Sequence, residues 1–201
     1  MFEVIFDCET KKFFDEDSLF NPEKLGVSVV SLYKREIGDN LEENNGEMQS
    51  FWEKDFAGMW DIFSKADRII GFNSLGFDVI ALSPYSPVSF KKLPHFDIMQ
   101  KIKEVEGKRV SLNAIAKATL ESQKIDNGQN AVLYWEKGDK QSLNKLKKYC
   151  EADVAITRDI YDFVLKNGNL KYIDFWNEVR KVELDFTYKK DNSSRVQHSL
   201  F

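Results

Sequence analysis

Cysteine is scarce in this chain, which has only Cys8 and Cys150 among its 201 residues. Neither cysteine belongs to a CxxC pair, and the sequence contains no cluster of cysteine and histidine, so it shows no sign of a structural zinc site. Two isolated cysteines are typical of a protein kept in a reducing compartment. We therefore expect an intracellular, cytoplasmic protein.

Long apolar runs and glycine-rich phosphate loops are also missing. No apolar stretch approaches the length needed to span a bilayer, and the beginning, MFEVIFD, lacks the basic segment and apolar run of a secretory signal. We expect no membrane partner. Without a Walker-type glycine loop, the chain is not expected to be an ATPase or a helicase by itself.

Positive charge is in slight deficit, with a formal net charge of −4 and a pI of about 5.4. Proteins that coat nucleic acid by bare electrostatics are usually basic, so the acidic balance argues against that class. It does not argue against an enzyme that meets phosphate through bound cations, because the cations supply positive charge.

Hydrophobic residues are plentiful, at 42% of the chain with 16 phenylalanines and 4 tryptophans. This content is enough for the core of one ordinary domain. We place that domain at residues 1–187, followed by a polar and flexible C-terminal tail at 188–201.

Periodicity predicts strands followed by alternating helices and strands. Apolar and β-branched runs predict strands at 2–7, 26–33, 48–51, 68–72 and 93–99. Helical spacing predicts helices at 51–66, 77–82, 111–120 and 142–165. Polar composition predicts loops at 38–46 and 121–140, and the segments 170–175 and 179–186 predict a terminal hairpin. This order indicates an α/β domain with a mixed sheet.

Asp7 and Glu9 stand two residues apart at the end of the first predicted strand. Residues at this spacing point to the same face of a strand, so their carboxylates are brought together, whereas Cys8 faces away into the core. Two neighbouring carboxylates repel each other, and a shared cation would explain the pair. A lone D-x-E at a solvated strand end is also common.

Asp78 and Asp153 lie in apolar surroundings. Asp78 opens a helix directly after a buried strand, where a carboxylate can also serve simply as a cap. The helical spacing around Asp153 places it on the packed face, and a buried carboxylate is costly unless it is paired or binds a metal. Tyr149 lies one turn earlier on the same face.

Taken together, the order D-x-E, N-x-x-x-F-D and Y-x-x-x-D resembles the three motifs of DEDD exonucleases, in the subgroup marked by a tyrosine. The matching residues are Asp7, Glu9, Asn73, Phe77, Asp78, Tyr149 and Asp153. The histidine subgroup would have histidine at the position of Lys148. Further stretches, including FDCETKKFFDE and KKYCEADVAITRDIYDF, are similar to the YprB-type ribonuclease-H-like exonuclease domain, and such domains are also found near helicases.

This resemblance implies a ribonuclease-H-like fold, a five-stranded mixed sheet with the first strand central and helices on both faces. It also implies two ions of Mg²⁺ or Mn²⁺ held by Asp7, Glu9, Asp78 and Asp153, with Asp7 bridging both. Tyr149 would orient the attacking water; it is not expected to be the base, because an unperturbed phenol has a pKa near 10.

The expected substrate is the 3′ end of a single strand, with DNA slightly favoured over RNA. By resemblance, Asn73 and Phe77 would contact it, although a turn and a core position explain them equally well. Lys12 and Trp135 could add phosphate contact and stacking, or be ordinary surface residues. Asp97 is expected to be a structural hydrogen-bond acceptor rather than a ligand.

Three functions remain open from the sequence alone. The favoured one is a 3′-to-5′ exonuclease that releases nucleoside 5′-monophosphates, with a helicase or polymerase as a possible partner. The second is a nucleic-acid-binding module of the same fold without catalysis, and the third is a structure-specific endonuclease. The presence of all four carboxylates and Tyr149 speaks against loss of catalysis.

Overall fold

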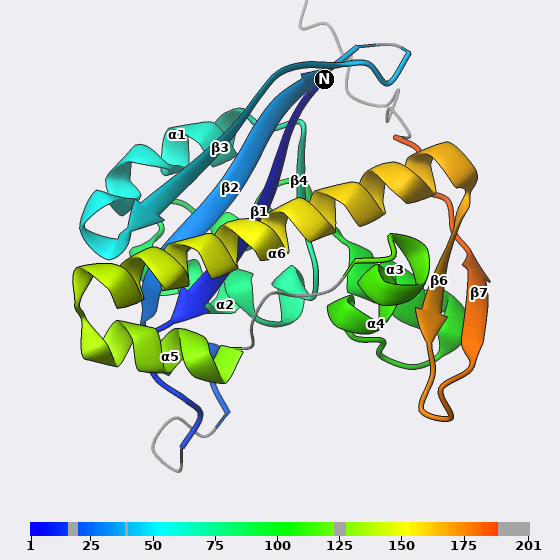
Figure 1. Ribbon diagram of the computed structural model, residues 1–201. Coiled ribbons are helices and arrows are strands. Elements are labelled where there is room, and N and C mark those ends of the chain that lie inside the picture. The colour runs from blue at the N-terminus through cyan, green and yellow to red at the C-terminus, as the bar shows by residue number, and fades with distance from the viewer. Residues whose placement is uncertain (16–19, 39, 123–127, 189–201) are drawn as a thin grey trace, which may run out of the picture.

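The apolar N-terminal segment forms the central strand of a five-stranded mixed sheet (Figure 1). The computed structural model describes residues 1–15, 20–38, 40–122 and 128–188. The strands of this sheet are β1 (Phe2–Thr10), β2 (Val27–Ile37), β3 (Glu43–Trp52), β4 (Arg68–Gly71) and β5 (His95–Asp97). Their order is β3-β2-β1-β4-β5, with β1 antiparallel to β2 and parallel to β4. The predicted ribonuclease-H-like α/β architecture with a central first strand is confirmed.

Helices cover both faces of the sheet, as Figure 1 shows. Alternation along β1 sends Val4 and Phe6 to one face and Ile5 to the other, and all three are buried. The first face packs against α1 (Trp60–Lys65) and α2 (Asp78–Leu82). The second packs against α3 (Ile98–Glu106), α4 (Leu112–Thr119) and α6 (Lys140–Asn167). Burying each of these apolar side chains contributes about 2 kcal/mol.

The long helix α6 crosses the second face and carries the third predicted motif (Figure 1). Asp139 caps its beginning by accepting from the backbone N–H groups of Gln141 and Ser142, and Gly168 ends it with a left-handed φ of 67°. Ser111 caps the beginning of α4 in the same way, by accepting from the backbone N–H of Ala114.

Buried polar contacts fix α6 against the sheet. Glu3 and Arg35 form a buried ion pair at 2.8 Å, and the Tyr161 hydroxyl of α6 donates to Glu3 at 2.9 Å. Arg35 also donates to both carboxylate oxygens of Asp162, at 2.8 and 2.5 Å. Because these bonds join the helix to β1 and β2, they fix the position of α6 over the sheet.

The aromatic segment after β2 differs from the prediction. The structure extends β3 to Trp52, and a 3-10 turn (Glu53–Gly58) precedes the short helix α1, so a single helix over 51–66 is wrong. Phe51 and Trp52 pair with Val30 and Val29 in the sheet, a tertiary pairing that helical spacing alone could not reveal. The strand also begins at Glu43, within the predicted loop at 38–46.

Two helices were not predicted. Helix α5 (Gly128–Lys137) occupies part of the predicted loop at 121–140, and its Ala131 packs against Leu146 and Cys150 of α6. Packing on α6, rather than a clear period of its own, stabilises this helix. The predicted strand at 93–99 is limited to β5, and α3 follows it immediately.

The predicted terminal hairpin is confirmed as β6 (Asn169–Ile173) and β7 (Val179–Glu183), which form a separate two-stranded sheet beside α3 and α4 (Figure 1). Of the predicted tail at 188–201, all but Tyr188 lies outside the described residues. None of the helices in the described part of the chain combines the length and apolar character needed to cross a bilayer.

Candidate active site

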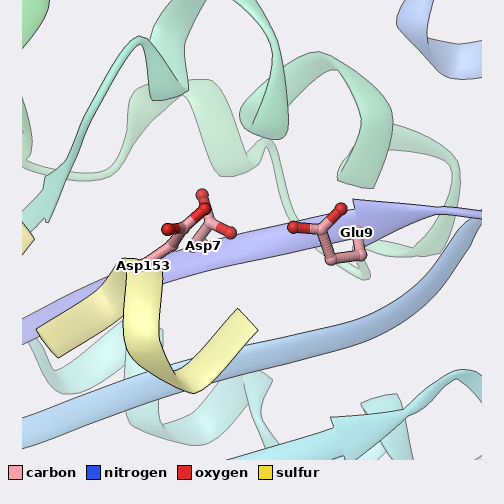
Figure 2. A group of neighbouring side chains, drawn as sticks. All are labelled: Asp7, Glu9 and Asp153. Carbon is pink, nitrogen blue, oxygen red and sulfur yellow. The ribbon is translucent and has the colours of Figure 1, made fainter. Parts of the chain in front are cut away.

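Three carboxylates that lie far apart in the sequence meet beside the central strand. Asp7 and Glu9 extend from β1, and Asp153 extends from α6 toward them (Figure 2). One carboxylate oxygen from each residue lies within 4.8 Å of the other two. The strand spacing and the helix face predicted from the sequence produce this convergence.

Burial differs within the acidic cluster, by which we mean Asp7, Glu9 and Asp153. Asp153 is 2% exposed, whereas Asp7 and Glu9 are half-buried. The strand does not end at Asp7 as predicted, because pairing with β2 continues to Thr10 with an irregularity after Glu9. Both acidic side chains of β1 therefore project from regular strand backbone, which restricts where their carboxylates can lie.

Mutual repulsion makes the acidic cluster suitable for a cation. Two unit charges 4.8 Å apart repel by about 0.9 kcal/mol in water and about 3.5 kcal/mol at an effective dielectric constant of 20. Three such groups are stable together when a positive ion lies among them. Since every donor is a carboxylate oxygen, the cluster could hold a hard divalent metal ion such as Mg²⁺ or Mn²⁺.

Asp78 lies beside this cluster but is not one of the three groups that meet within 4.8 Å. It is the first residue of α2, and its Oδ1 accepts from the backbone N–H of Cys8 at 3.0 Å. Burial raises the pKa of Asp78 to about 6, against the hydrogen bonds from Cys8. The carboxylate is thus joined to the residue between Asp7 and Glu9 and does not simply cap its own helix.

Tyr149 lies one helical turn before Asp153 and is 3% exposed. Burial raises the pKa of Tyr149, and the charges of Asp153, Glu9 and Asp7 raise it further. The phenol therefore remains protonated at any physiological pH. It can donate a hydrogen bond next to the acidic cluster, and it cannot act as a base there.

A row of small polar side chains behind Asp7 was not anticipated. Sheet register places Ser31 opposite Asp7 and Ser50 opposite Ser31. The two serine hydroxyls are 2.9 Å apart, and Ser50 donates to Glu151 of α6 at 2.8 Å. The Cys150 thiol donates to the carbonyl oxygen of Asp7 at 3.5 Å and to its carboxylate at 3.8 Å. The available signal was one serine within the apolar run GVSVVSLY, Ser31, and another in β3, Ser50.

Comparison with known proteins identifies the family. Residues 4–165 match the RNase_H superfamily, which is most of the chain. The chain belongs to the RNase_H superfamily. None of the curated proteins matches the sequence significantly.

Two solved structures resemble this RNase_H superfamily member. The family B DNA polymerase of the hyperthermophilic archaeon Pyrobaculum calidifontis matches with a TM-score of 0.60 and 18% identity, over 82% of this chain and 24% of the polymerase chain. The zinc-bound complex of E. coli ExoI with single-stranded DNA matches with a TM-score of 0.49 and 13% identity, over 83% and 41%. This chain thus spans less than half of either protein, and at these identities the similarity to the polymerase shows a shared fold.

In this RNase_H superfamily domain, Asn73 has a mainly structural environment. Its backbone is left-handed, with φ of 62°, and its N–H donates to Asp97 at 2.9 Å. Asp97 also accepts from Leu75 and Gln100, so its expected role as a structural acceptor is confirmed. The side-chain oxygen of Asn73 accepts from Arg109 at 2.7 Å, and both residues line an open groove of about 600 Å³.

The other residues predicted to contact substrate lie in different surroundings. Phe77 is half-buried and immediately precedes Asp78, and Lys12 is exposed shortly after β1. Trp135 of α5 is half-buried and stacks on Trp52, with ring centroids 6.4 Å apart. Its ring therefore packs in part against the domain, and contact of these three residues with substrate stays a prediction.

Proposed function

We propose that this chain is a metal-dependent 3′-to-5′ exonuclease that hydrolyses single-stranded nucleic acid to nucleoside 5′-monophosphates. The observation that carries the proposal is the approach of Asp7, Glu9 and Asp153 to within 4.8 Å beside the central strand. Membership of the RNase_H superfamily supports nuclease chemistry at this position. The assignment to the tyrosine subgroup of DEDD exonucleases is part of the proposal and rests on the motif resemblance.

The acidic cluster would hold two divalent cations, Mg²⁺ or Mn²⁺, with Asp78 as the fourth carboxylate. When bound between carboxylates, such ions activate a water molecule and stabilise the leaving oxygen of a phosphodiester. Asp78 would hold the second ion partly through water, because its Oδ1 already accepts from the backbone N–H of Cys8. Oxygen-only donors and half-burial of Asp7 and Glu9 support this choice of metal.

Tyr149 is assigned to orienting the attacking water. Its hydroxyl keeps its proton because burial, the largest cause, raises its pKa, and burial persists when bound cations offset the charges of the nearby carboxylates. A protonated phenol can donate one well-directed hydrogen bond but cannot take up the proton of the water. Removal of the proton from the attacking water therefore does not depend on Tyr149. The residue contributes by holding that water in a fixed orientation.

The substrate we propose is the 3′ end of a single strand, DNA somewhat more than RNA. The preference for DNA, and a helicase or polymerase as partner, agree with a fold like that of part of a DNA polymerase but are proposals. Asn73, Phe77, Lys12 and Trp135 are the residues we assign to strand contact. Lys12 would bind phosphate, and the rings of Phe77 and Trp135 would stack on bases.

The test is a digestion of DNA and RNA strands of equal sequence, each labelled at the 5′ end in one sample and at the 3′ end in another. With Mg²⁺ or Mn²⁺ we expect a descending ladder from the 5′-labelled strand and immediate release of a labelled mononucleotide from the 3′-labelled one. EDTA should abolish both. A circular single strand is the control, and it should survive.

Three outcomes would contradict the proposal. Cleavage of the circle would indicate the endonuclease alternative, and a mononucleotide released first from the 5′-labelled end would reverse the polarity. Strand binding without hydrolysis by any metal would indicate a binding module.

A further inference from the structure

The β6–β7 hairpin exposes large apolar side chains at its turn. Phe175 and Trp176 are 93% and 74% exposed, and Val179, at the start of β7, is 62% exposed. Leaving such groups in water forgoes the free energy of burying them, and neighbouring exposed apolar groups mark a binding surface. Packing within the domain therefore does not explain the composition of this turn.

Hydrogen bonds to one side chain hold the turn in a fixed shape. The Asp174 carboxylate accepts from the backbone N–H groups of Trp176 and Glu178, both at 2.9 Å. It also accepts from the side chain of Arg180 at 2.8 Å. The rings of Phe175 and Trp176 lie edge-on, with centroids 5.7 Å apart. Because the backbone of the turn is already ordered, a ligand that binds these rings loses little free energy in ordering it.

The outer face of the hairpin carries two lysines directly opposite each other. The inner face, with Leu170, Tyr172 and Val182, is buried against the rest of the domain. Register pairs Lys171 with Lys181, and alternation along the strands places both on the outer face, where they are exposed. Like charges at such a cross-strand position destabilise the strand pair. A negatively charged ligand on this face would explain why both are present.

The positive charge of this face is available to a ligand. Lys181 pairs with Glu183 at 2.6 Å, but both side chains are more than half exposed, and an ion pair in water contributes little. Among the described residues, no carboxylate lies within ion-pair distance of the Lys171 ammonium. The hairpin therefore presents one free and one weakly paired lysine beside its exposed rings.

The hairpin is attached to the domain at a distance from the acidic cluster. Figure 1 shows β6 and β7 on the far side of α3 and α4 from β1. The Thr119 hydroxyl of α4 donates to the carbonyl oxygen of Lys171 at 2.6 Å and accepts from its N–H at 2.9 Å. A ligand on the outer face of the hairpin is thus held by a fixed element and does not touch the carboxylates.

We propose that Lys171, Lys181, Phe175 and Trp176 form a second contact for single-stranded nucleic acid, which we call the hairpin surface. The lysines bind phosphates and the rings stack on bases. A single strand offers a phosphate and a flat base at every nucleotide, which matches lysines beside rings, whereas an apolar protein surface would leave the lysines unpaired. This inference rests on the proposed exonuclease function and deepens it, because the strand held here is the substrate at a distance from its 3′ end.

The experiment measures binding of 5′-fluorescein-labelled oligothymidines to the full chain by anisotropy, in Ca²⁺ to slow cleavage. One strand has about 4 nucleotides and the other about 30, below and above the length that one binding surface covers. The wild-type protein should bind the long strand more tightly. Trp176→Ala should weaken binding of the long strand by about tenfold, as for the loss of one stacked base, and binding of the short strand much less. Trp176→Phe, which keeps a ring, should recover most of the loss, whereas Trp176→Leu should resemble Trp176→Ala.

The lysines are tested through the salt dependence of the same binding. Removal of one phosphate contact with a single strand makes the slope of log affinity against log salt less steep by about 0.7. Lys171→Gln should show this change with the long strand, and Trp176→Ala should keep the wild-type slope. The thermal stability of Lys171→Gln should be equal to that of the wild type or higher, because a repulsive cross-strand pair is removed.

The matched control is Lys65→Gln. Lys65 is an exposed lysine in the last turn of α1, which packs on the other face of the sheet from α4. Its loss makes the same change in net charge outside the hairpin surface, so affinity and salt slope should remain those of the wild type.

Equal salt slopes of Lys171→Gln and Lys65→Gln, or wild-type affinity of Trp176→Ala for the long strand, would overturn the hairpin surface while leaving the exonuclease intact. A wild-type protein that neither binds nor cleaves any strand would instead overturn the proposed function, and the hairpin surface with it.

Discussion

Replacing Asp7 by asparagine should separate catalysis from stability. Asp7 is half-buried and lies within 4.8 Å of two other carboxylates, so it has two repulsive partners. Solvent access places the effective repulsion near the aqueous value of about 0.9 kcal/mol per pair rather than the value of about 3.5 kcal/mol for a less exposed site. The two pairs together come to about 1.7 kcal/mol, and a weaker contact from the Cys150 thiol offsets part of this gain, so Asp7→Asn should stabilise the metal-free protein by about 1 kcal/mol.

For a chain of this length, 1 kcal/mol corresponds to a rise in melting temperature of about 2–4 °C. The measurement is thermal unfolding in EDTA, followed by the same scan with Mg²⁺. The wild-type protein should gain stability on adding Mg²⁺ because the ion binds only the folded state, and the variant should gain much less. Cleavage by the variant should be abolished at every metal concentration.

Asp61→Asn is the matched control, since Asp61 is an exposed carboxylate on α1. It should leave activity and the response to Mg²⁺ unchanged. A fall of several degrees in the melting temperature of metal-free Asp7→Asn would refute the reasoning, because it would show that the Asp7 carboxylate holds the fold together through contacts such as the one from Cys150.

Three further predictions concern single side chains. Tyr149→Phe should lower the single-turnover rate by roughly one to three powers of ten with little change in strand affinity, since only a positioned hydroxyl is lost; an unchanged rate would make Tyr149 a packing residue. Cys150→Ala should raise the Mg²⁺ concentration for half-maximal rate by roughly threefold, because a weak donor to Asp7 is removed, and Cys150→Ser should restore it; equal behaviour of both variants would contradict a positioning role. Burial lowers the pKa of His95, although its hydrogen bond to the Phe90 carbonyl acts in the opposite direction. Below about pH 6.5 the unfolded chain therefore binds a proton at His95 that the folded chain does not bind. The wild-type protein should therefore lose more unfolding free energy than His95→Gln between pH 7 and pH 5, as measured by urea titration; parallel losses would exclude His95 as the cause.

The elements with one strong period were predictable from the sequence. The run FEVIFD predicts the central strand, and the spacing of Leu146, Tyr149, Asp153 and Ile160 predicts both α6 and the face that carries Asp153. Because period and burial agree in these segments, Asp153 could be placed on the packed face of its helix, whereas its approach to Asp7 and Glu9 was implied by the motif resemblance.

Elements that depend on tertiary partners were not predictable. Phe51 and Trp52 fit a helical face and a strand equally well, and pairing with β2 decides between them. Helix α5 is stabilised by packing on α6, and the spacing of apolar residues within α5 does not reveal that contact.

The same limit applies to the candidate site. Three carboxylates follow from local spacing, but the hydrogen bond from Cys8 to Asp78 depends on how α2 meets β1. The Ser31 and Ser50 row depends on sheet register across three strands. Sequence reasoning therefore found the acidic side chains and missed the polar contacts that hold them.

The most direct test of the central claim is the position of the metal. Crystals grown with Mn²⁺ and a nucleoside 5′-monophosphate should show anomalous scattering among the carboxylates of Asp7, Glu9 and Asp153, with the phosphate bound to the same ions. Saturating Mn²⁺ that gives no anomalous peak at these carboxylates, or a nucleotide phosphate bound elsewhere, would contradict the account.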